Sequence, residues 1–158
     1  MKKYFLLVLS IYIIAFIWHN SLLDAIHSDG DSLALAAVVQ KLLAWIGWSA
    51  PTGMLDDVLR KMAHVAEFMV LGGVVSLALS YVSESQIKRF WGALALGLCI
   101  AATDELLQLF SDGRACQLTD VGIDGMGVLI GCVLAYLVRR WGWIWLQDGI
   151  RVGCTEES

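Results

Sequence analysis

The sequence predicts an all-α membrane protein: a polytopic bundle of four transmembrane helices, with one interfacial or re-entrant helix between the first two. Two observations lead to this fold class. Hydrophobic residues make up 58% of the 158-residue chain, with a mean hydropathy of +0.69 and a single proline, which is typical of membrane proteins rather than water-soluble domains. The apolar residues also fall into long runs, and about 20 of them in a helix cross a hydrocarbon core of about 30 Å.

Four apolar runs predict the membrane spans. The first is short, but Lys2 and Lys3 flank it, and lysine side chains can reach from a buried helix end to the interface. This run resembles a signal peptide, yet no small-x-small cleavage site precedes the polar residues 19–21, so we expect a retained anchor. The predicted spans are residues 4–18, 58–82, 90–110 and 121–138.

A further apolar run, residues 33–48, decides the topology. If it does not span, seven lysines and arginines lie on one side of the membrane and four on the other, a bias that places both termini in the cytoplasm. If it does span, the count is five against five, with Lys41 inside the membrane. We therefore predict that this run lies at the outer interface or dips partly into the membrane, with Trp45 and Trp48 at headgroup level.

Residues 1–140 are expected to form a single domain, followed by a Trp-rich interfacial segment and acidic cytoplasmic tail at 141–158.

The remaining composition excludes several classes of site. The net charge of −4 and the scattered basic residues argue against a nucleic-acid surface. No two of the four cysteines fall on the oxidising side and none form a CxxC pair, so we expect no intramolecular disulfide and no cysteine zinc site.

Ionisable residues occur at or just inside the ends of the apolar runs. A charge at the centre of a membrane helix costs about 2.5–3.5 kcal/mol or more, so such residues normally face the bundle interior or a water-filled cavity. The predicted topology brings all of them to the extracytoplasmic half of the bundle. They are Lys61, His64 and Glu67 in the second span, Asp104, Glu105 and Gln108 in the third, Arg114 in the loop after it, and Asp120 and Asp124 in the fourth.

Small residues share helix faces with these polar groups. On the second span, Lys61, His64 and Glu67 follow steps of three and spread over about 120° of the surface, so they need not face one partner. Small side chains let helices approach closely in lipid, which predicts that the polar ends open from packed seams. The two stripes are Gly97, Ala101, Asp104 and Gln108, and Asp120, Asp124, Gly127 and Gly131.

The same residues resemble the VanZ-like family of bacterial integral membrane proteins over residues 56–138, and residues 1–20 fit the first helix of that family more loosely. Many relatives carry Tyr where this chain has Phe68. The family takes its name from a protein that raises teicoplanin resistance in Gram-positive bacteria, so the resemblance implies a cell-envelope role at the outer face and an effect on glycopeptide susceptibility. The matching motifs are Arg60-Lys61-Met62-Ala63-His64-Val65-Ala66-Glu67-Phe68 with Leu71-Gly72, Asp104-Glu105-Leu106-Leu107-Gln108, Gly113-Arg114, and Asp120 and Asp124 with Gly127 and Gly131.

Two functions fit the polar cluster. In the first, an intramembrane enzyme acts on a lipid-linked or phosphate-bearing envelope substrate, since lysine and arginine suit phosphate and crowded carboxylates supply an acid or a base. In the second, a lipid or glycolipid binder or translocator uses the acidic groups and His64 as a proton relay, and a chain this small would then act as a homo-oligomer. For the enzyme, the expected catalytic residues are His64, Glu67, Asp104, Glu105 and Asp124, and the substrate-binding residues are Lys61, Gln108, Arg114 and Asp120.

Two further interpretations stay open. Mixed nitrogen and oxygen ligands for a divalent cation are available, but spacing across three helices cannot test their geometry, so no metal or other cofactor is assigned. Buried salt bridges that fix helix register are the structural alternative, with Lys61 or Arg114 joined to Asp120 and His64 joined to Asp104. Interhelical polar contacts in membranes average only about 0.6 kcal/mol, which favours a site over stability alone. The ligands of the cation would be His64, Glu67, Asp104, Glu105 and Asp124.

Overall fold

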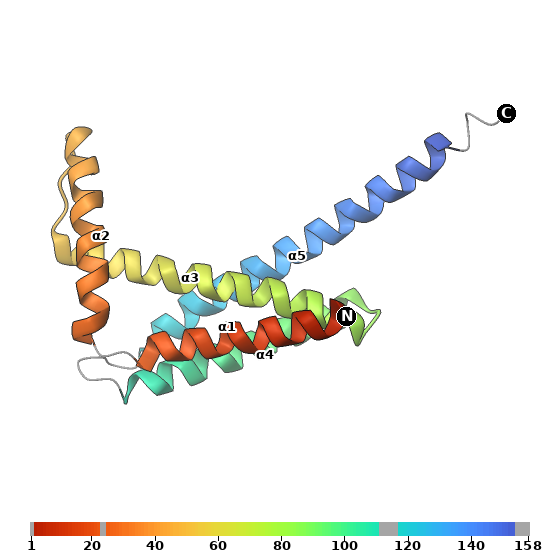
Figure 1. The fold of residues 1–158 in the computed structure, drawn as a ribbon, viewed down its shortest axis with the longest axis horizontal. Helices are drawn as coiled ribbons and strands as arrows, with labels where there is room; N and C mark the ends of the chain where they lie inside the picture. Colours follow the sequence, from red (N-terminus) through yellow and green to blue (C-terminus); the bar gives the residue numbers. More distant parts are fainter. Residues whose placement is uncertain (1, 23–24, 111–116, 154–158) are drawn as a thin grey trace.

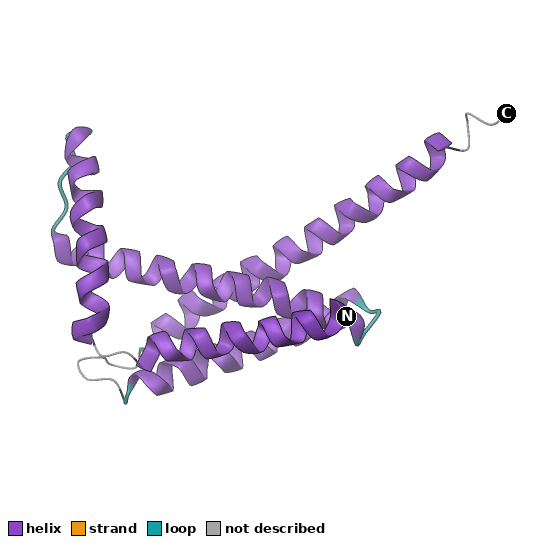
Figure 2. Ribbon diagram, viewed as in Figure 1, coloured by secondary structure: helices purple, strands orange, loops and turns teal. Residues whose placement is uncertain are grey.

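Helices form almost the whole of the described chain in a computed structural model, joined by short loops (Figure 2). The structure describes the backbone of residues 2–22, 25–110 and 117–153, and the side chains of residues 4–22, 35–110 and 117–141. The elements are α1 (Lys2–Leu22), α2 (Ala25–Trp45), α3 (Thr52–Ala78) with a 3₁₀ turn η1 (Leu79–Tyr81), α4 (Gln86–Gln108) and α5 (Leu118–Gly153).

Four of these helices are long and apolar enough to cross a membrane, which confirms the predicted fold class. The candidate spans are Tyr4–Leu22, Thr52–Tyr81, Gln86–Gln108 and Leu118–Trp141. Large apolar side chains remain exposed on their outer surfaces, for example Phe5, Trp91 and Leu129, as expected for helices that face lipid rather than water. The chain is therefore a multi-pass membrane protein.

The helix between the first two spans has a shorter apolar part, Leu35–Trp45. It lies crosswise at one end of the other helices (Figure 1) and packs on the start of α3 through Ala36, Ala50 and Leu55. Gly47 ends it with a φ of 77°, where the Gly47 and Trp48 amides donate to the Ala44 and Leu43 carbonyls in the pattern that closes many helices with glycine. This helix agrees with the predicted non-spanning element.

Helix α3 is the centre of the bundle, because it contacts α1, α2, α4 and α5. One continuous core joins Ile17 of α1, Phe68 and Leu71 of α3, Ala101 of α4 and Val128 of α5. The ends of α1 and α4 and the beginnings of α3 and α5 all meet at the end of the bundle where α2 lies (Figure 1). The described polar residues His64, Asp120 and Asp124 lie at that end, whereas the N-terminus lies at the opposite end (Figure 1).

The seam between α3 and α5 is formed by glycine. A Cβ atom at Gly131 would meet the Met69 carbonyl oxygen, and one at Gly127 would meet the Val65 carbonyl oxygen. On the facing helix, a Cβ at Gly72 would meet the backbone of Val128. Backbones that approach this closely in lipid are held by packing, so the small-residue stripe predicted on α5 is a helix–helix contact.

Helix α5 continues to Gly153, beyond the predicted end of the span at Val138. The apolar run does stop near Arg139 and Arg140, but charged residues keep full helix propensity and do not interrupt the backbone hydrogen bonds. The sequence signal at this point therefore marks the end of the hydrophobic span and not the end of the helix.

Candidate functional site

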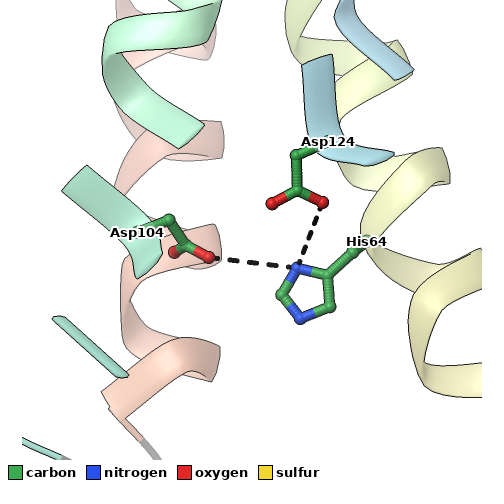
Figure 3. A group of neighbouring side chains, drawn as sticks. All are labelled: His64, Asp104 and Asp124. Atoms are coloured by element: carbon green, nitrogen blue, oxygen red, sulfur yellow. Dashed lines mark ion pairs between the residues drawn. The ribbon is translucent and has the colours of Figure 1, made fainter. Parts of the chain in front are cut away.

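Three ionisable side chains from three helices converge inside the polar end of the bundle. His64 comes from α3, Asp104 from α4 and Asp124 from α5, and both carboxylates point toward the imidazole (Figure 3). The Nδ1 atom of His64 lies 3.9 Å from Asp104 Oδ2 and 3.9 Å from Asp124 Oδ1. Both distances are those of ion pairs rather than of hydrogen bonds, so the His64–Asp104 pair anticipated in the structural alternative is present as a long ion pair.

Burial separates this cluster from the surface. The side chains of Asp104 and Asp124 are 0% and 2% exposed, and that of His64 is 16% exposed. Asp104 shares its buried stripe with Gly97 and Ala101, and Asp124 shares its own with Gly127. The small residues bring α3, α4 and α5 close together, so the helix packing itself holds the three functional groups within a few ångströms.

Helix α1 orients one member of the cluster. The Ser21 hydroxyl donates a hydrogen bond of 2.6 Å to Asp104 Oδ1, which leaves Oδ2 as the oxygen on the His64 side. Ser21 does not line the neighbouring cavity. Its hydrogen bond to the Asp104 carboxylate is therefore that of a positioning residue.

A cavity of about 350 Å³ opens next to the cluster, which lies within the range of small-molecule sites. His64 and Asp124 form part of its wall, whereas Asp104 lies behind them. Most of its lining is polar, and it combines residues from the start of α3, the end of α4 and the start of α5. The lining residues are Asp57, Arg60, Lys61, His64, Glu105, Gln108, Gln117, Asp120, Ile123 and Asp124.

The cations of this cavity are paired with carboxylates. Lys61 Nζ donates to Asp120 Oδ1 at 2.8 Å, one of the salt bridges anticipated from the sequence. Arg60 pairs with Asp57 at 2.9 Å on the same helix. Four carboxylates and two cations line the cavity in the described part of the chain, so its electrostatic potential favours positive charge unless a bound group changes the balance.

The other predicted site residues have different surroundings. Glu67 accepts a hydrogen bond of 3.1 Å from Asn20 of α1 and does not line the cavity. Glu105 lines it, and its Oε2 accepts from the Gln117 amide at 2.9 Å, which ties the end of α4 to the start of α5. Gln108 is also part of the cavity wall. Arg114 lies outside the described residues.

The cysteines form no disulfide in the described part of the chain. Cys99 and Cys132 are free thiols, and Cys116 and Cys154 lie outside the described residues.

The sequence analysis missed the contributions of α1 and of Asp57 in the second turn of α3. Asn20 and Ser21 directly follow the first apolar run, at the end of the bundle where the polar site was predicted. Their position in the sequence could therefore have indicated that α1 contributes to the site. Asp57, Lys61 and His64 recur at i, i+4 and i+7, so a helical stripe would have added Asp57 to the site. The expectation that Lys61, His64 and Glu67 need not face one partner agrees with the structure, since Lys61 approaches Asp120, His64 approaches Asp104 and Asp124, and Glu67 approaches Asn20.

The donor set of the cluster is compatible with a metal ion. One imidazole nitrogen and two carboxylate oxygens all lie within 4.8 Å of one another, and mixed nitrogen and oxygen sets of this kind bind divalent cations. Glu67 and Glu105, the other ligands considered from sequence, are not part of this group.

The comparison with protein families identifies the chain. The VanZ/LLP1 family model matches residues 4–139, which takes in all four candidate spans up to Arg139 and every member of the cluster. No curated protein and no solved structure matches the chain. The match extends the resemblance seen at residues 56–138 back through the first span, and the chain belongs to the VanZ/LLP1 family.

Proposed function

We propose that this protein acts at the outer face of the cell membrane on a lipid-linked, phosphate-bearing envelope substrate that enters the cavity. The observation that carries the proposal is the position of His64 and Asp124 in the wall of a cavity of about 350 Å³, at the end of the bundle where several candidate spans begin or end. A lipid headgroup lies at the end of a membrane span, so this position suits an amphiphilic substrate.

The proposed roles follow from where each side chain lies. His64 and Asp124 contact the bound group or an attacking water from the cavity wall, and Asp104 supports His64 from behind. Lys61 exchanges Asp120 for a phosphate oxygen, because the Lys61 side chain is 41% exposed and already lines the cavity. Arg60 and Gln108 complete the binding of the headgroup, since guanidinium and amide groups donate several hydrogen bonds to phosphate. Arg114 is proposed to join them on its guanidinium chemistry alone.

The orientation of the protein is part of this proposal. The seven-to-four distribution of lysine and arginine supports cytoplasmic termini and an outward-facing cavity. An outward cavity would meet envelope intermediates after they reach the outer leaflet. Altered handling of such intermediates would change susceptibility to teicoplanin-type glycopeptides, which act outside the membrane.

Turnover by purified protein tests the enzymatic proposal. The protein is reconstituted in vesicles that contain bacterial envelope lipids, including lipid-linked phosphates and pyrophosphates, and the lipids are followed by mass spectrometry. We expect one lipid to be converted, and conversion to stop in His64→Ala. His19→Ala is the matched control, because His19 is exposed and does not line the cavity. Equal conversion by both variants would contradict the role of His64.

The alternative function is a non-catalytic lipid or glycolipid binder or translocator. Two further polar groups that do not line the cavity favour this alternative. They are the buried Asp104 carboxylate and the Glu67 carboxylate, which accepts a hydrogen bond from Asn20, and such groups can relay protons. Stoichiometric binding of a lipid without a product would support this alternative. A homo-oligomer in the vesicles would add to that support, because a single chain is small for a transporter.

A further inference from the structure

We infer that His64, Asp104 and Asp124 bind one divalent transition-metal cation, of the Zn²⁺ or Mn²⁺ class. The inference deepens the proposed function and rests on it for the role of the ion, although the binding of the ion stands on geometry alone. Three observations carry it: the convergence of the ligand atoms, a buried carboxylate oxygen directed into the cluster, and the charge of the cavity beside it.

The ligand atoms are close enough for one ion to bind all three. An ion bound at about 2.1 Å from each ligand keeps any two ligand atoms within about 4.2 Å. The two distances from His64 Nδ1, each 3.9 Å, meet this limit. One ligand atom of each residue lies within 4.8 Å of those of the other two. Tetrahedral ligands at about 2.1 Å from one ion are about 3.4 Å apart, so the side chains would close by about 0.5–1.4 Å around the ion.

Asp124 supplies an observation independent of this clustering. Its side chain is 2% exposed, and its Oδ2 atom is buried with no hydrogen-bond partner in the described part of the chain. Figure 3 shows the carboxylate directed into the space between His64 and Asp104. A buried carboxylate oxygen without a donor is costly, and a cation in that space satisfies it.

The charges around the cluster also favour a bound cation. Asp104 and Asp124 are buried together, and four carboxylates but only two cations line the adjoining cavity. Both cations, Arg60 and Lys61, are already in ion pairs. A divalent ion neutralises the two buried aspartates, and its open coordination positions can accept a phosphate oxygen.

The surroundings of the cluster hold the ligands in place. Ser21 donates to Asp104 Oδ1, and a hydrogen bond to the second oxygen of a ligating carboxylate fixes its orientation. The glycine seam keeps α3 and α5 in contact beside His64 and Asp124. Three protein ligands leave further coordination positions for water or substrate, and His64 and Asp124 place these positions next to the cavity.

Metal binding without substrate tests the inference. The full-length protein is purified in detergent, treated with EDTA, and titrated separately with Zn²⁺, Mn²⁺ and, for comparison, Mg²⁺; bound metal is measured by mass spectrometry and affinity by calorimetry. We expect one Zn²⁺ or Mn²⁺ per chain, with at least a tenfold weaker affinity in Asp124→Asn. Asp120→Asn is the matched control, because the same substitution one helical turn away removes a carboxylate that pairs with Lys61 and leaves the cluster intact.

His64→Gln is the second variant, in case Asp124→Asn does not fold, and helicity and gel-filtration profiles confirm the fold of each protein. Absence of stoichiometric binding in the unaltered protein would overturn the inference, as would equal loss of metal in Asp120→Asn and Asp124→Asn. The test is separate from lipid turnover. Bound metal without turnover would support binding of the ion and contradict the enzyme, whereas turnover by metal-free protein would contradict a role for the ion in the reaction and leave the enzymatic proposal standing.

Discussion

Asp120 and Asp124 lie about one helical turn apart on α5 and have different surroundings. Asp120 is 24% exposed and pairs with Lys61 at 2.8 Å, whereas Asp124 is 2% exposed and lies between His64 and Asp104. The sequence places both residues in one stripe and cannot distinguish them, because the difference arises from how deeply α5 enters the bundle. At the scale of single residues, depth along a helix therefore decides which carboxylate forms an ion pair and which joins the cluster.

The hydrogen bond from Ser21 to Asp104 gives a prediction about stability. Ser21→Ala removes the donor of a fully buried carboxylate oxygen, so we expect the free energy of unfolding to fall by about 1–3 kcal/mol. Thermal or denaturant unfolding in detergent measures the change. Ser10→Ala is the control, because the Ser10 hydroxyl donates to the Leu6 carbonyl of its own helix. A destabilisation of similar size in both variants would show that the Ser21–Asp104 hydrogen bond contributes no more to stability than a hydrogen bond within one helix.

Among the elements, the helices that carry the site were predictable and their ends were less so. The apolar runs predicted four spans and a shorter helix between the first two, and the glycine spacing on α5 predicted its contact face. The end of α5 was not predictable, because hydrophobicity reports the membrane boundary while backbone hydrogen bonds continue to Gly153. The part of α1 in the site was also missed, since Ser21 meets Asp104 across 83 residues of sequence and only packing brings them together.

The glycine contacts between α3 and α5 predict that one face of α5 tolerates a large side chain and that the face packed on α3 does not. Gly131→Leu should lower the folded yield and the melting temperature in detergent, because any side chain there meets the Met69 carbonyl and pushes α3 and α5 apart. Gly122→Leu is the control on the same helix, since nothing lies within 4 Å of a Cβ atom at that position. An unchanged yield for Gly131→Leu would place this stripe against lipid instead.

The whole molecule combines a lipid-facing bundle with one polar end. With α2 outside the membrane core, the four candidate spans bring the N-terminus and the far end of the α5 span to the side opposite the cluster. The polar residues of the four spans meet only because α1 and α4 finish, and α3 and α5 begin, at the same end. This convergence could be predicted from topology, but the distances within the cluster and the cavity beside it depend on three-dimensional packing.

Reporter fusions test the proposed orientation. The charge distribution predicts that a fusion at Gly30 reports outside and a fusion after Ser158 reports inside. Alkaline phosphatase and green fluorescent protein activity in intact cells distinguish the two locations. If the fusion after Ser158 reported outside, the five-helix topology with residues 33–48 as a span would replace the four-span topology, and the cavity at the start of α5 would face the cytoplasm.

The central claim is that the converging polar residues form a functional site and do not simply hold helices in register. The most direct measurement is lipid conversion or binding per molecule of folded protein for His64→Ala, Asp104→Asn and Asp124→Asn, with protein abundance determined in the same membranes. A functional site predicts that each variant loses function at close to wild-type abundance. Removing one partner of a buried structural pair instead costs about 3–5 kcal/mol, so a joint loss of function and abundance in all three variants would contradict the account.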